Sequence, residues 1–416
     1  MTVVDESSLR YPGWRVVAAC FLVELFIFGF GLYGHAVYLA ELQRLYGWPT
    51  AVISTASTLS FLLGSVLAAF TADAIAWMGP RRLVLFGMSA LAASTTLLAF
   101  AQAPWQLYAA YILLSFGWAG MGTVVAATIL RAWFDRRSGL AISLAFNGAT
   151  FGGIVLAPLL VLLVEAVGFT LAMLAATAGM LVLLGPVVIA LIRLPAVASE
   201  RSESREGSAR LQTKEELPQW SRGSLLRSVP FWTVCAPFAL ALLAQVGFIV
   251  HQIALLEPAM GRSLAGLAVG VTTAMAVIGR LCLGLAADRI DPRLATAVSL
   301  VTQAGALLAL TWTSHVPSLF LACAVYGFSI GNLITLPALI TQREFESAAF
   351  GAVLALSTAV GGVVSALGPG LVGLVRGAAG GYAAALVLCL VLKLLAAAIV
   401  LLRPRAAAGV THPTGS

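Results

Sequence analysis

The sequence predicts an all-α membrane protein whose twelve transmembrane helices form two six-helix bundles related by a pseudo-two-fold axis. Composition, the length of the apolar runs and an internal repeat carry this prediction. Of the 416 residues, 60% are hydrophobic and 10% charged, and the mean hydropathy is +0.99. Soluble domains contain roughly 25% charged and 45–50% apolar residues. This composition excludes a soluble protein and indicates a chain surrounded by lipid.

Twelve apolar runs of about 20 residues or more, the length that crosses the hydrocarbon core, follow one another with short polar breaks. The expected spans are 14–40, 50–76, 82–101, 105–132, 138–165, 168–193, 229–256, 263–288, 293–312, 317–341, 347–375 and 380–402.

A charged, serine-rich stretch divides these runs into two sets of six. Residues 201–208 read Arg-Ser-Glu-Ser-Arg-Glu-Gly-Ser and cannot bury a core. We therefore expect an N-terminal bundle (1–193), a cytoplasmic linker (194–228), a C-terminal bundle (229–402) and a cytoplasmic tail (403–416).

The two sets repeat at an offset of about 212 residues. Gly79-Pro80-Arg81 aligns with Asp291-Pro292-Arg293, each between a second and a third span. Arg131 aligns with Arg343 at the end of a fourth span. One offset that holds at separate places favours duplicated six-helix units.

Basic residues are concentrated on one side of the predicted membrane. Of the 24 Lys and Arg residues, Arg44, Arg262 and Arg376 fall on the other side, and Arg280 and Lys393 fall within spans. Cytoplasmic loops carry an excess of Lys and Arg, so both termini are predicted to be cytoplasmic in a multi-pass protein of the cell inner membrane. Basic residues placed in short loops argue against a nucleic-acid partner.

The end of the eighth span and the loop that follows it read Gly284-Leu-Ala-Ala-Asp288-Arg289-Ile-Asp-Pro-Arg293. It resembles the cytoplasmic loop signature of the major facilitator superfamily. The repeat places a degenerate counterpart in the first half, with Ala76 where the signature has an acid. The residues that could form a conformational latch at these loops, rather than only fix the topology, are Asp73, Arg81, Arg82, Gly284, Asp288, Arg289 and Arg293.

Two further segments resemble the monocarboxylate transporter branch of that superfamily and its bacterial oxalate–formate relatives. The first span opens with Tyr11-Pro12-Gly13-Trp14-Arg15, and the fifth follows Trp133-Phe134-Asp135-Arg136-Arg137. Arg136 and Arg137 join the latch candidates. The resemblance implies a small carboxylate substrate, often moved with a proton.

Arg280 lies inside the eighth span. A cation at that depth is costly and marks a functional site, and guanidinium pairs bidentately with carboxylate. In the resembling family an arginine in this helix binds the substrate carboxylate, and Arg280 matches it. The alternative is a structural ion pair with Glu24 of the first span.

The chain departs from the resembling families at three places. Animal monocarboxylate transporters have an acid one turn before this arginine, where Ala276 stands, and a lysine in the first span, which contains none. Oxalate-type relatives have a second cation in the eleventh span, and 347–375 contains none. A single buried arginine favours a monocarboxylate and leaves the proton carrier unassigned.

The proton-coupling candidates are Glu24, His35 and His251. Histidine titrates near working pH, and His251 is favoured because Gln245 and Gln252 make its span unusually polar. Other side chains that could contact substrate rather than pack helices are Asn147, Tyr33, Tyr111, Trp118, Tyr326 and Asn332. Lys393 is interpreted as reaching toward the cytoplasmic face.

The sequence predicts a transporter, with no enzyme activity, cofactor or metal. The expected function is alternating-access transport of a lactate- or pyruvate-like monocarboxylate in symport with protons, by a monomer. Alternatives are an exchanger of organic anions, a drug or metabolite exporter of the same superfamily, and a carrier-like receptor.

Overall fold

The computed structural model describes residues 6, 8, 11–134, 137–193, 222–286, 289–345 and 347–402. The linker from 194 to 221, the tail from 403, Arg136 and Asp288 lie outside the described residues. Every described regular element is a helix, and twelve stretches are long and apolar enough to cross a membrane. The predicted number of spans is therefore confirmed. Two of the spans hold π-turns, which widen the helix by one residue per turn.

The first half runs through ten α-helices and two π-turns. They are α1 (Gly13–Phe28), η1 (Gly29–Tyr33), α2 (Gly34–Tyr46), α3 (Thr50–Ala68), α4 (Thr71–Met78), α5 (Pro80–Ala99), α6 (Pro104–Met121), α7 (Thr123–Trp133), α8 (Ser138–Phe151), η2 (Gly152–Leu156), α9 (Ala157–Val167) and α10 (Phe169–Leu191).

The second half begins with one short helix and continues in longer ones. They are α12 (Arg222–Leu226), α13 (Val229–Met260), α14 (Arg262–Ala286), α15 (Pro292–Trp312), α16 (Val316–Ile330), the 3₁₀ turn η3 (Gly331–Ile334), α17 (Leu336–Glu344), α18 (Ser347–Ala366), α19 (Gly368–Ala379) and α20 (Tyr382–Leu401).

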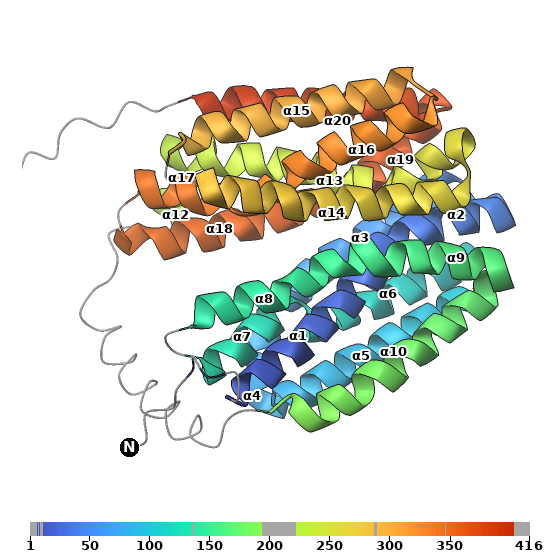
Figure 1. Cartoon of the computed structure of the whole chain (residues 1–416), viewed down its shortest axis with the longest axis horizontal. Helices are drawn as coiled ribbons and strands as arrows, with labels where there is room; N and C mark the ends of the chain where they lie inside the picture. Colours follow the sequence, from blue (N-terminus) through green and yellow to red (C-terminus); the bar gives the residue numbers. More distant parts are fainter. Residues whose placement is uncertain are drawn as a thin grey trace, which may run out of the picture.

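The helices form two groups that lie side by side (Figure 1). In the first group α1 packs on α8 and α6 packs on both α3 and α5. In the second, α13 packs on α18 and α20, α14 on α16, and α15 on α20. The outer face of α10 is apolar and open, with Val182 71% and Leu183 62% exposed. A surface of this kind fits lipid tails rather than water.

We call the end of the molecule where α1 begins and α20 ends the terminus end, and the opposite one the far end. Short turns close the far end, and four of them contain a glycine at positive φ, namely Gly47, Gly168, Gly261 and Gly380. Glycine has no Cβ to clash there, so each helix can stop sharply and the next can begin within a few residues.

The two segments that carry the monocarboxylate-transporter resemblance meet at the terminus end. The ring of Tyr11 lies 5.2 Å from that of Phe134, and the ring of Trp14 lies 4.9 Å from it. The Tyr11 hydroxyl also donates to the Trp133 carbonyl. These contacts join the start of α1 to the end of α7, which explains why aromatic residues occupy both segments.

Candidate functional site

Arg280 lies on α14 where it passes η3, and its side chain is half-buried. Its Nε donates to the Gly331 carbonyl at 3.4 Å, and no other hydrogen bond or ion pair of this side chain is present within the described residues. The η3 backbone is pressed against α14, since a Cβ added to Gly331 would lie 1.9 Å from the Ala276 carbonyl oxygen. Arg280 is therefore held at Nε with donors left over for a ligand.

Tyr33 brings the first half to this arginine. It is the last residue of η1, and the opposing turn η2 packs against η1 and α14. Gly153 of η2 marks the contact, because an added Cβ would lie 2.7 Å from both the Tyr33 ring and the Thr273 hydroxyl. The Tyr33 hydroxyl lies within electrostatic reach of the Arg280 guanidinium. A half-buried cation and a tyrosine thus meet between the two halves, an arrangement that suits a small anion.

Trp118 lies beside this junction. Its ring lies 4.8 Å from the Phe28 ring. The ring also covers Gly31 of η1, since a Cβ added to Gly31 would lie 3.1 Å from Trp118 Cε3. Trp118 therefore packs against η1, the turn that contains Tyr33.

Three other sequence-derived candidates make side-chain contacts that do not involve Arg280. Tyr111 packs edge-on against His35 at 4.8 Å, within the first half. Tyr326 is fully buried in the second half against Phe248. Asn332 follows Gly331, but its amide donates to Ser299 of α15 at 3.2 Å.

Asn147 is half-buried on α8, directly before the glycine that packs on α1. It lies one turn and a half before Gly153, on the helix that leads into η2.

The three proton-coupling candidates have different surroundings. His251 is satisfied at both ring nitrogens, by the Tyr382 hydroxyl at 3.1 Å and the Pro369 carbonyl at 3.0 Å. His35 is fully buried among aromatic rings, and neither of its nitrogens has a partner within the described residues. Glu24 is also fully buried, and neither carboxyl oxygen has a partner there. The ion pair between Glu24 and Arg280 that the sequence left open is not formed.

A family model described as Major Facilitator Superfamily matches residues 21–369, most of the chain and parts of both halves. The chain belongs to the major facilitator superfamily. The resemblance stated from the loop motifs is therefore confirmed, and the protein is a member of a family of membrane transporters.

Curated relatives of this superfamily member include monocarboxylate transporter 13 of Bos taurus, 27% identical over 383 residues, with 90% of this chain and 85% of the relative covered. Monocarboxylate transporter 11 of Mus musculus is 27% identical over 403 residues, covering 91% and 84%. A solved bacterial homologue of the human lysosomal transporter Spinster, described as inward-facing and occupied, superposes with a TM-score of 0.72. It is 14% identical over 94% of this chain and 97% of that one, which shows the fold.

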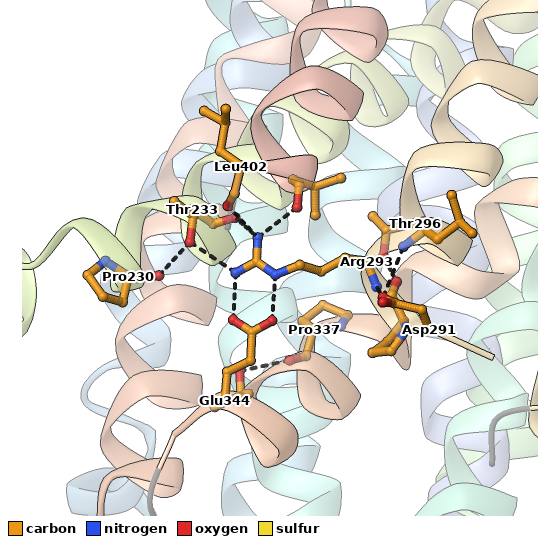
Figure 2. Close-up of polar contacts among 12 residues, drawn as sticks. Pro230, Thr233, Asp291, Arg293, Thr296, Pro337, Glu344 and Leu402 are labelled. Atoms are coloured by element: carbon orange, nitrogen blue, oxygen red, sulfur yellow. Dashed lines mark hydrogen bonds and ion pairs between the residues drawn. The ribbon is translucent and has the colours of Figure 1, made fainter. Parts of the chain in front are cut away.

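Arg293 is the buried member of the superfamily loop signature (Figure 2). Its Nε and Nη2 bind the two carboxyl oxygens of Glu344 at 2.5 and 2.6 Å. Nη1 donates to the carbonyls of Val400 and Leu402, and Nη2 donates to Thr233. One guanidinium therefore ties α15 to α13, α17 and the end of α20.

The other latch candidates that the structure describes form no comparable cluster in this superfamily member. The described candidates with exposed positions at the terminus end are Asp73, Arg81, Arg82, Arg137, Gly284 and Arg289. Of these residues, Arg137 donates its backbone amide hydrogen to the Glu6 carboxylate at 2.9 Å. Sequence reasoning missed Glu344; an acid directly after Arg343 at the end of a span was the available signal.

Lys393 does not reach the cytoplasmic face, and that interpretation is wrong. It is fully buried, and its Nζ donates to the Ala241 carbonyl at 2.8 Å and to Gln303 Oε1 at 2.6 Å. The Nζ also lies 5.7 Å from the centre of the Tyr326 ring. Lys393 lies on the side of α20 that packs against α13 and α15, so its side chain points into the second half, whereas Leu394 and Leu395 next to it are exposed.

Ion pairs join the two halves at the far end. The buried carboxylate of Glu41 on α2 binds Arg262 of α14 at 3.0 Å and Arg44 at 2.8 Å. Arg262 also pairs with Glu257 at 3.5 Å, and Ser263 donates to Glu165 of α9. This cluster was not predicted from the sequence, because its members are up to 222 positions apart. In the observed conformation these contacts close the far end.

Proposed function

We propose that this superfamily member is a secondary transporter that moves a small monocarboxylate, lactate- or pyruvate-like, in symport with protons by alternating access. The observation that carries the proposal is the half-buried Arg280 facing Tyr33 between the halves. A guanidinium with unused donors in a membrane span is the chemistry that a carboxylate requires. The names of the distant relatives support the same substrate class.

A single arginine at this junction favours one carboxylate over two. In the part of the chain that the structure describes, two lysine or arginine side chains are fully buried, Arg293 and Lys393. Both are enclosed within the second half. A dicarboxylate would leave its second charge without a cation at the Arg280 site, which is costly in a membrane interior.

The proposed cycle moves residues 1–193 against 229–402 around Arg280, Tyr33 and Trp118, with Asn147, Tyr111, Tyr326 and Asn332 as further contact candidates in other conformations. The protein would lie in the cell inner membrane as a monomer, with the terminus end cytoplasmic. The basic loop residues at that end support this orientation. The latch candidates, Asp288 and Arg136 included, would then face the cytoplasm.

The test is uptake of labelled lactate into liposomes that contain the purified protein, with and without an inward proton gradient. Arg280→Ala should abolish gradient-driven uptake, and Arg280→Lys should keep a fraction of it, because lysine keeps the charge without the planar fork. Arg227→Ala removes an exposed cation before α13 and is the matched control.

Full uptake by Arg280→Ala would mean that the anion site lies elsewhere. Uptake that depends on anion inside the liposomes and not on the proton gradient would favour the organic-anion exchanger. A protein that binds no monocarboxylate would leave the metabolite exporter of the same superfamily as the better reading.

A further inference from the structure

Glu24 is a carboxylic acid enclosed in the first half, with no hydrogen-bond partner among the described residues. Its exposed fraction is 0%, and neither oxygen accepts or donates a hydrogen bond within the described residues. It lies on α1 five residues before η1, the turn that presents Tyr33 to Arg280. Buried polar groups are almost always hydrogen-bonded, so an orphaned buried carboxyl is an observation that requires an explanation.

Among the described residues, the surroundings of Glu24 offer no counter-ion. The helices that pack on α1 are α6, α7, α8 and α10, together with the two π-turns. None of their titratable side chains bonds to Glu24, and α8 and α10 have none. The titratable residues of α1 and of the elements packed against it are Arg15, Cys20, Tyr33, Tyr108, Tyr111 and Arg131.

Of these groups the thiol of Cys20, one turn before Glu24, lies within electrostatic reach of it. Arg15 is exposed near the start of α1, and Tyr108 bonds to Thr55 at 2.7 Å. A carboxylate anion at Glu24 would therefore be isolated in an apolar interior. An isolated buried charge is so unfavourable that the group takes up a proton instead.

We propose that Glu24 holds a proton in the observed conformation and is the group that carries the coupled proton through the transport cycle. This inference rests on the proton symport proposed above and assigns its carrier. His251 is less suited, because both of its nitrogens are already satisfied by Tyr382 and Pro369. A protonated His35 would be a cation among the rings of Phe61, Tyr111 and Tyr38, with no acceptor in the described structure.

The packing of α1 on α8 couples this proton to the substrate site. A Cβ added to Gly148 of α8 would lie 2.0 Å from the Phe21 carbonyl oxygen and 3.1 Å from the Glu24 Cβ. Helices this close leave no room for water between them at Glu24. Loss of the proton therefore requires α1 and α8 to separate or turn, and both continue directly into the π-turns that place Tyr33 and Gly153 beside Thr273.

The transport test compares natural protein with Glu24→Gln, which imitates the protonated side chain. We expect Glu24→Gln to keep exchange of labelled for unlabelled lactate at equal pH, within about twofold. Gradient-driven accumulation should fall by at least about tenfold, because the variant has no proton to release. Gradient-driven accumulation equal to that of the natural protein overturns the proposal, and so does loss of exchange together with accumulation.

A second readout does not depend on lactate. The natural protein in lipid at neutral pH should show the infrared carbonyl band of a protonated carboxyl group, and Glu24→Gln should lack it. Glu165→Gln, which alters an exposed carboxylate at the far end, should keep the band. If the natural protein moves no lactate, the proposed substrate is wrong while the band still decides the protonation of Glu24. A natural protein without the band overturns the inference.

Discussion

Removing the charge of Glu344 tests whether the Arg293 cluster stabilises the terminus end of the second half. In Glu344→Gln the buried guanidinium loses a bidentate carboxylate with contacts at 2.5 and 2.6 Å. Breaking a buried ion pair by removing one partner costs about 3–5 kcal/mol. Two differences reduce this value here. Glu344 is 33% exposed, so solvent screens part of the attraction, and Arg293 keeps its bonds to Val400, Leu402 and Thr233.

We therefore expect Glu344→Gln to lower the free energy of unfolding by about 2 kcal/mol. The reverse variant, Arg293→Met, leaves a carboxylate that water can reach, so removing Glu344 as well should cost little more. The measurement is denaturant unfolding in detergent micelles, followed by tryptophan fluorescence, for both single variants and the double variant. A double variant that is less stable by the sum of the single effects would show that the two side chains do not interact and would refute the reasoning.

Two further predictions concern helix packing and the far end. Gly148→Ala should lower the unfolding free energy by about 1–3 kcal/mol, because the new Cβ meets the Phe21 carbonyl at 2.0 Å. Gly139→Ala on the same helix, where nothing lies within 4 Å, is the control; thermal unfolding that ranks the two variants equally would contradict the packing argument. Glu41→Gln should open the far end. If the free energy that favours the closed over the open far end falls by about 1 kcal/mol, the open fraction rises about fivefold. Impermeant maleimide labelling of a cysteine introduced at Ser54, which faces Gly373 across the halves, measures this in a background without other cysteines. Glu257→Gln, which breaks the longer 3.5 Å pair within the second half, should change labelling less, and equal effects would rule out Glu41 as the main closing contact.

The spans were predictable because length and apolarity alone decide whether a helix crosses lipid. Arg280 stood out for the same reason, since a cation inside an apolar run is rare. The position of Tyr33 opposite this arginine depends on how two separate helices pack, and no local pattern in the sequence encodes it. Neither π-turn was predicted from the sequence.

The repeat was informative about topology and less so about side chains. It aligned Arg81 with Arg293, yet Arg81 is exposed while Arg293 is buried against Glu344. Lys393 was misjudged because distance along α20 to its end says nothing about which side of the helix faces the other helices. Both cases depend on helix rotation, which the apolar runs of a membrane protein specify weakly because every face is apolar.

The paired π-turns give the proposed substrate site a way to change shape without unfolding. A π-turn contains one surplus residue, and when that surplus moves along the helix by one position, the side chains it passes rotate by about 100° around the axis. In η1 such a step would swing Tyr33 away from Arg280 as α1 turns against Gly148 of α8. The first span would then turn at its midpoint while its two helical segments stay intact, and Tyr33 would be the side chain that moves.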